Sequence, residues 1–137
     1  MKIIIPSAGP VPDQRTADYV INIAKRLNAQ LIVLRILSEA ETEAEGEQSL
    51  RLFVENGKTE KVPVNIILRR GDIASVIIET AIEKSVDLII LGVNRGEIVA
   101  EWMNAGAMER TDIPVLLIPK WVRGVGYRRR KAERELS

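Results

Sequence analysis

A glycine-punctuated loop, Gly92 to Gly96, contains the residues of this sequence whose types and spacing are best suited to chemistry. The loop directly follows Val86 to Leu91, an apolar segment with the pattern of a buried strand. In α/β proteins ligands bind outside the carboxyl ends of the strands, so we expect a ligand site here. Backbone N–H groups and the guanidinium of Arg95 could hold a small anion, although Arg95 could equally be a solvated surface cation.

Histidine and cysteine are both absent from the sequence. A Ser-His-Asp or Cys-His mechanism is therefore excluded, and so are disulfides and thiolate metal sites. Zinc and copper would lack their commonest ligands, and no carboxylate cluster for Mg²⁺ is evident beside the glycine loop. The sequence offers no convincing set of catalytic residues, so we expect neither an enzyme nor a metal site.

The length and the composition predict one domain. The 137 residues are 46% hydrophobic, which is sufficient for a single core without disulfides. The formal net charge of +1 predicts no particular partner. The first apolar run, Ile3 to Pro6, is too short for a signal peptide, and no apolar run approaches the length of a membrane span. We therefore expect a cytoplasmic protein with no membrane span.

Short apolar segments alternate with segments of helical periodicity along the chain. A helix is predicted after Pro12-Asp13 and another after Gly71-Asp72, where Asp72 is placed to cap the free N–H groups. Pro63 suits the third strand to a sheet edge. The alternation indicates parallel strands joined by right-handed crossovers, with helices on both faces of the sheet. The predicted strands cover residues 2–7, 31–37, 62–68, 86–91 and 113–118.

Acidic residues crowd the stretch from Glu39 to Glu47, which is followed by Leu50 as the first large apolar residue. Such a stretch could bind a cation or a basic partner. We favour a mobile, solvated loop that leads into a helix, because charge runs of this kind are usually solvated. The helix would carry Leu50, Phe53, Val54 and Gly57 on one face.

Two interpretations of Gly106 compete. If Gly106 opened the last helix, the residues before Pro114 would allow about two turns, although a parallel crossover needs a dozen residues or so. Alternatively, Asn94 and Glu97 have the spacing of a capping box, and one helix would cover residues 94–110. We prefer the continuous helix, which places Gly106 inside it at a cost of about 1 kcal/mol relative to alanine.

Four segments of the chain resemble the universal stress protein family in their order and spacing. They are KIIIPSAG at the amino terminus, AKRLNAQLIVLRIL, RRGDIASVIIETAIEKSVDLIILG and IPVLLIPK. The resemblance implies a family domain over residues 1–120, with the Rossmann-like α/β fold of the adenine nucleotide alpha hydrolase type. It also implies three layers, in which helices cover both faces of an open five-stranded parallel sheet of order 3-2-1-4-5.

This strand order places the candidate ligand site. Strands one and four are neighbours whose connections leave in opposite directions, so the loops that follow them border one crevice. Some members of the family bind ATP in this crevice, whereas another branch binds no nucleotide. Trp102 could stack on a ligand base, but its helical spacing is more typical of a core or interface residue. The expected walls of the crevice are Pro6, Ser7, Ala8 and Gly9 on one side and Gly92, Val93, Asn94, Arg95 and Gly96 on the other.

The sequence departs from the nucleotide-binding pattern of the family, which has an aspartate in the first loop and Gly-x2-Gly-x9-Gly-Ser/Thr after the fourth strand. Ala8 stands at the aspartate position. Gly92-x3-Gly96 is one residue too long, whereas Gly96-x9-Gly106 matches the second interval. Ala107 replaces the hydroxyl residue that would contact phosphate. We therefore expect no cofactor, although backbone groups of the two loops could still hold ATP or AMP.

The last strand and the tail suggest partners. Family members commonly dimerise through the last strand, and Ile113 to Ile118 supplies an apolar edge that would otherwise invite aggregation. We therefore expect a homodimer. Residues 121–137 form a basic tail, which could capture nucleic acid, anionic lipid or an acidic partner, or could be solvated or packed on a partner.

Three functions remain open at this point. The first is a non-enzymatic stress-response or regulatory protein of the universal stress type, with a degenerate nucleotide crevice. The second is a universal stress protein that binds ATP or AMP. The third is a nucleotide-using transferase or hydrolase that performs adenylyl or phosphoryl transfer.

Overall fold

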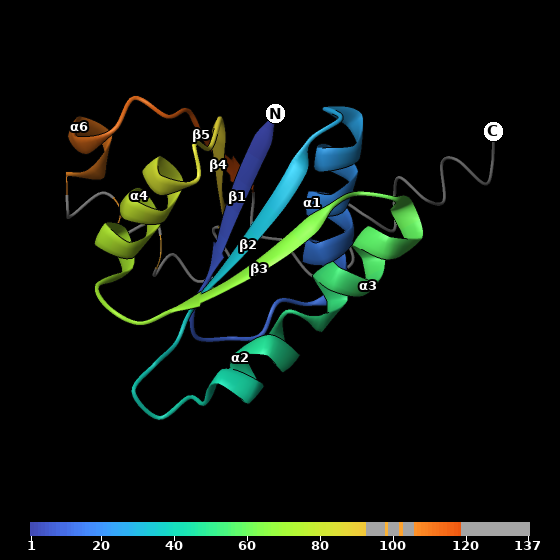
Figure 1. The fold of residues 1–137 in the computed structure, drawn as a ribbon, viewed down its shortest axis with the longest axis horizontal. Helices are drawn as coiled ribbons and strands as arrows, with labels where there is room; N and C mark the ends of the chain where they lie inside the picture. Colours follow the sequence, from blue (N-terminus) through green and yellow to red (C-terminus); the bar gives the residue numbers. More distant parts are fainter. Residues whose placement is uncertain (93–97, 99–101, 103–105, 119–137) are drawn as a thin grey trace.

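The chain folds around a parallel β-sheet. The computed structural model describes residues 1–92, 98, 102 and 106–118. Strands alternate with helices along the chain, as the sequence predicts (Figure 1). The elements are β1 (Lys2–Ser7), α1 (Gln14–Arg26), β2 (Gln30–Ile36), α2 (Glu43–Ser49), α3 (Arg51–Glu60), β3 (Val64–Arg69), α4 (Ile73–Glu83), β4 (Leu88–Gly92), α6 (Ala107–Arg110) and β5 (Val115–Ile118).

The strands of the sheet have the order β3-β2-β1-β4-β5, and every pairing is parallel. β1 lies at the centre, where Ser7 is opposite Arg35 of β2 and Ile3 is opposite Leu88 of β4. β3 and β5 form the two edges. The predicted order 3-2-1-4-5 is therefore confirmed, and so is the edge position of the strand that follows Pro63.

Alternate residues of the central strand enter cores on opposite faces of the sheet. Ile3 and Ile5 lie in the core covered by α1 and α3. Ile4 lies in the opposite core, together with Ile77 of α4 and Trp102. Figure 1 shows α1 and α3 on one side of the sheet and α4 and α6 on the other. A strand that is buried on both faces needs apolar residues at successive positions, which explains the run from Ile3 to Pro6 in β1.

Aspartates cap α1 and α4, two of the helices that follow strands of the sheet. Asp13 accepts a hydrogen bond from the Thr16 backbone N at 2.8 Å, and α1 begins at Gln14, directly after Asp13. Asp72 accepts one from the Ser75 backbone N at 3.1 Å at the start of α4, as predicted. Each cap satisfies an N–H group that has no partner within the helix itself.

The acidic stretch is partly helical, which corrects the expectation of a loop, although its glutamates other than Glu41 are exposed as expected. It contains α2, and Thr42 and Glu45 form a capping box at the start of this helix. Gly46 packs so tightly that a Cβ atom there would lie 2.5 Å from Leu37 Cδ2. The capping box and this close approach position α2, although its sequence has no apolar stripe.

Gly106 does not lie inside a helix, so the preferred interpretation of this residue is wrong. Its φ is 64°, in the left-handed region, and it is the N-cap of α6. A left-handed residue breaks the right-handed path of a helix, and glycine adopts that conformation at little cost. Ile98 and Trp102 are helical earlier in the crossover. The argument from crossover length fails because helical residues lie on both sides of Gly106.

Candidate functional site

The expected crevice lies where β1 and β4 run side by side at the centre of the sheet. Ile4 pairs with Ile89, and both strands end at the same edge, so the loops that follow them leave the sheet as neighbours. The ligand site itself stays a prediction, because part of one wall falls outside the described residues. The structure describes Pro6, Ser7, Ala8, Gly9 and Gly92, whereas Val93, Asn94, Arg95 and Gly96 lie outside the described residues.

A side chain from the neighbouring strand binds two hydrogen-bond acceptors in the crevice wall that follows β1. Arg35, on β2, donates from Nη1 to Ser7 Oγ at 2.8 Å and from Nη2 to the Gly9 carbonyl oxygen at 2.6 Å. Ala8, which lies between them, has no polar side-chain atom. The loop after β1 is therefore held from within the protein at the positions where the sequence predicts a ligand.

Arg35 is itself buried, and only 3% of the residue is exposed. Glu41 supplies its counter-charge through two hydrogen bonds, from Nε to Oε2 at 2.9 Å and from Nη2 to Oε1 at 3.2 Å. The two side chains are 4% and 12% exposed, so little water competes with the pair. A guanidinium that is buried to this degree requires such an anion.

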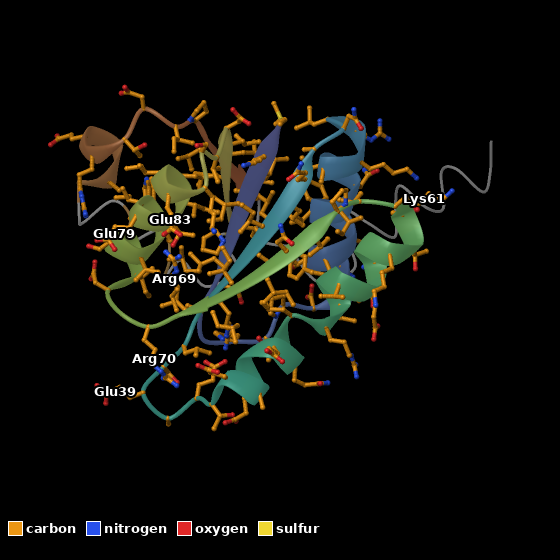
Figure 2. All side chains as sticks on the ribbon, in the orientation of Figure 1. Glu39, Lys61, Arg69, Arg70, Glu79 and Glu83 are labelled. Carbon is orange, nitrogen blue, oxygen red and sulfur yellow. The ribbon has the colours of Figure 1, made fainter. Side chains whose placement is uncertain are left out.

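A second arginine holds the loop that carries Glu41. Arg70, which follows β3, donates to the carbonyl oxygens of Ser38 and Glu41, the latter at 2.6 Å. Figure 2 shows Arg70 next to the loop that connects β2 to α2. The loops after β1, β2 and β3 are thus tied together by the side chains of Arg35, Glu41 and Arg70.

None of these three residues is among the site residues predicted from the sequence. A signal was nevertheless present for Arg35, which is the charged residue of an otherwise apolar segment, LIVLRIL. Side chains alternate along a strand, and both faces of this segment are buried. A charge on a buried face requires a partner, and that requirement could have marked Arg35.

The alanines that replace polar residues of the family pattern contribute apolar surface. Ala107 is fully buried, and Ala8 packs against the same core. Trp102 also lies in this core and is 1% exposed, which confirms the core interpretation. Its Nε1 has no hydrogen-bond partner within the described part of the chain. The Ala8 side chain therefore offers a ligand van der Waals contact but no hydrogen bond, and the buried Ala107 side chain is not accessible to a ligand.

Several carboxylates act as caps and ion-pair partners. The Ser75 hydroxyl and backbone N–H bind the Asp72 carboxylate and hold its pKa below the ordinary value. The hydrogen bond from Arg69 does the same for the pKa of Glu83, and Figure 2 shows these two side chains together. Within residues 1–92, 98, 102 and 106–118, no group of three potential ligands could hold a metal ion. In the same residues no helix is long and apolar enough to cross a membrane.

Comparison with protein families gives a match that covers the whole described fold. The model of the universal stress protein family matches residues 1–119. The match ends close to residue 120, where the composition of the sequence becomes basic. No protein of curated function matches the sequence significantly.

Solved structures with the same fold include nucleotide complexes. A universal stress protein in complex with cAMP is 21% identical, with a TM-score of 0.66 over 88% of this chain and 97% of that one. An Arabidopsis thaliana protein of the family, with AMP bound, is 16% identical and has a TM-score of 0.63 over 88% and 92%. An Archaeoglobus fulgidus universal stress protein in complex with dAMP is 16% identical, with a TM-score of 0.65 over 86% and 97%. These likenesses show the Rossmann-like fold.

Proposed function

Because the chain belongs to the universal stress protein family, we propose that it is a non-enzymatic, regulatory member of that family with a degenerate nucleotide crevice. It acts through protein partners in the cytoplasm, as a homodimer, and not through turnover of a nucleotide. On this proposal the crevice does not bind ATP or AMP tightly.

The observation that carries this proposal is the use of the first crevice loop inside the protein. Arg35 binds Ser7 Oγ and the Gly9 carbonyl oxygen, and Ala8 has no side-chain acceptor to offer a ribose or an adenine. Ala107, at the position of the family's hydroxyl residue, is buried in the core. A ligand would have to rely on backbone groups, which supports weak or absent binding of nucleotides.

A calorimetric or thermal-shift titration of the full chain with ATP and AMP, with and without Mg²⁺, tests the proposal. We expect no saturable stabilisation at micromolar nucleotide. A ligand that binds the native state must raise its stability, by about 2.7 kcal/mol at a hundredfold excess over Kd, so tight binding would be visible and would refute the proposal. Ala8→Asp, which restores the family's acceptor, is the matched variant and should bind more tightly than the wild type.

A second candidate, an ATP- or AMP-binding universal stress protein, is favoured by one observation. Gly106, whose spacing from Gly96 fits the family's glycine pattern, has a left-handed φ of 64° and is the N-cap of α6, so it begins a helix as a phosphate-loop glycine would. Solved relatives in complex with cAMP, AMP and dAMP have the same fold. The same titration decides between the two candidates. No observation on the described residues favours the transferase or hydrolase.

The proposed homodimer is supported by the exposed edge of the sheet. β5 is an edge strand whose Leu116 and Leu117 are 40% and 52% exposed. Edge strands of this kind present unpaired backbone groups as well as apolar side chains, and a second copy of the chain would cover both. The basic tail, residues 121–137, lies outside the described residues, and its binding to nucleic acid stays a prediction.

A further inference from the structure

We propose that Arg35 is the binding residue of an oxyanion site, and that Glu41 fills this site as a displaceable internal anion. The ligand is a phosphate or carboxylate group presented at the carboxyl edge of the sheet. The inference deepens the proposed function, because it names a ligand class for the same edge, and it rests on that function only for this location.

The geometry of the Arg35–Glu41 pair is that of a bound oxyanion. Nε and Nη2 of the guanidinium donate to the two carboxylate oxygens, at 2.9 and 3.2 Å. This two-pronged arrangement matches the spacing of oxygen atoms in carboxylates and phosphates alike. The Glu41 side chain therefore stands where the acid group of a ligand would lie.

The two partners of the pair are held very differently. Arg35 belongs to β2, next to the central strand of the sheet, and its guanidinium is fixed by Ser7 and Gly9. Glu41 belongs to a surface loop in which Ser38 is exposed. Arg70 holds its backbone carbonyl, and its carboxylate accepts, besides the bonds from Arg35, a hydrogen bond from the Ser38 backbone N at 3.4 Å. A rotation of the Glu41 side chain would break its bonds to Arg35 and Ser38 and release the carboxylate to water. Arg35 would keep its bonds to Ser7 and Gly9, and Arg70 would keep its bonds to the two carbonyl oxygens of the Glu41 loop.

Because Arg35 is buried, its guanidinium would bind another anion if the Glu41 carboxylate moved away. A guanidinium whose side chain is 4% exposed cannot easily lose its counter-charge, because an uncompensated buried charge is strongly destabilising. The position also agrees with the general rule that ligands of parallel α/β sheets bind outside the carboxyl ends of the strands. An incoming oxyanion would thus replace Glu41 as the partner of Arg35.

Glu41→Gln, in the full chain, tests the inference with inorganic phosphate and acetate as probes at constant ionic strength. The variant keeps the size of the side chain and removes its charge. We expect phosphate to raise the melting temperature of Glu41→Gln saturably. The phosphate concentration that gives half of the maximal increase should be about tenfold lower for the variant than for the wild type. The acetate arm shows whether the site prefers carboxylates, and either preference supports the inference.

Two control variants separate the site from general salt effects. Glu43→Gln removes the same charge from the exposed start of α2 and should respond as the wild type does. The double variant Glu41→Gln with Arg35→Met should lose the saturable response. Phosphate also stabilises proteins without binding them, and this non-saturating effect should be equal in all variants.

An equal response of Glu41→Gln and the wild type would overturn the inference, and so would a response that survives Arg35→Met. If Glu41→Gln is unfolded in chloride, refolding that saturates with phosphate concentration supports the site, and the absence of saturable refolding overturns it. The proposed function fails on a different result, the tight binding of ATP or AMP by the wild type.

Discussion

A buried arginine at the end of β2 determines how the neighbouring loops are held. Arg35 sits opposite Ser7 in the parallel register and reaches the loop after β1 on one side and Glu41 on the other. Deep burial makes each of these contacts valuable, because the alternative is a charge with no partner. At the scale of single residues, the carboxyl edge of the sheet is organised by this guanidinium and by Arg70.

The cap of α4 predicts how stability depends on pH. The folded-state pKa of Asp72 is lowered, chiefly by the Ser75 hydroxyl. Its carboxylate therefore contributes stability above the unfolded pKa of about 3.9, and this contribution is lost as the pH falls through the lower folded pKa. Asp72→Asn keeps a capping side chain and removes the charge, so its deficit in the free energy of unfolding should be present at neutral pH and shrink at about pH 3.

Urea denaturation of the wild type and of Asp72→Asn at the two pH values measures this deficit. Glu79→Gln is the matched control, because it removes an exposed carboxylate from the same helix. A deficit of equal size at neutral and acidic pH would contradict the assignment of a charged cap to Asp72.

At the scale of elements, the start of α6 at Gly106 can be tested by whether Gly106→Ala raises or lowers the free energy of unfolding. In an uninterrupted helix, Gly106→Ala would stabilise the protein by about 1 kcal/mol. With φ at 64°, we expect the same change to destabilise it by about 1 to 2 kcal/mol, since alanine is strained in the left-handed region. The nearest atom to a Cβ there would be Glu109 Oε2 at 3.9 Å, so the effect comes from the backbone and not from a clash.

Gly106→Asn provides the control for this prediction, because asparagine tolerates left-handed conformations better than alanine does. Urea denaturation should rank Gly106→Asn between the wild type and Gly106→Ala. A stabilised alanine variant would restore the continuous helix that the sequence suggests.

Elements with a hydrophobic pattern could be predicted from the sequence, whereas those held by specific contacts could not. β1 and the cap of α4 at Asp72 were predicted because burial on both faces and capping leave local signals. α2 was missed because a capping box and the close approach of Gly46 to Leu37 position it. Gly106 was misassigned because spacing alone does not specify its φ.

The candidate site shows the same division. Pro6, Ser7, Ala8, Gly9 and Gly92 lie at the ends of β1 and β4, where the topology places them. The Arg35–Glu41 pair was not predicted because its partners meet at the edge of the sheet through the fold of a loop. The spacing of the acidic residues in the sequence does not indicate which of them contacts Arg35.

At the scale of the whole molecule, the exposed strand β5 predicts the oligomeric state. Leu117→Lys places a charge on this edge and should convert a dimer into a monomer, because lysine on an edge strand opposes pairing with a second sheet. Sedimentation velocity should show the mass of two chains for the wild type and of one chain for the variant. Ile82→Lys, a similar change at a 60% exposed position on α4, should leave the dimer intact. A dimer that survives Leu117→Lys would exclude β5 as its interface.

The arginine ties at the carboxyl edge also bear on local unfolding. The loops after β1, β2 and β3 share the Arg35, Glu41 and Arg70 side chains, so none of the three can open without breaking contacts of another. Proteins open in cooperative units, and shared contacts set the boundaries of such a unit. Opening at this edge is therefore a collective event, in which segments distant along the chain would exchange their amide hydrogens together.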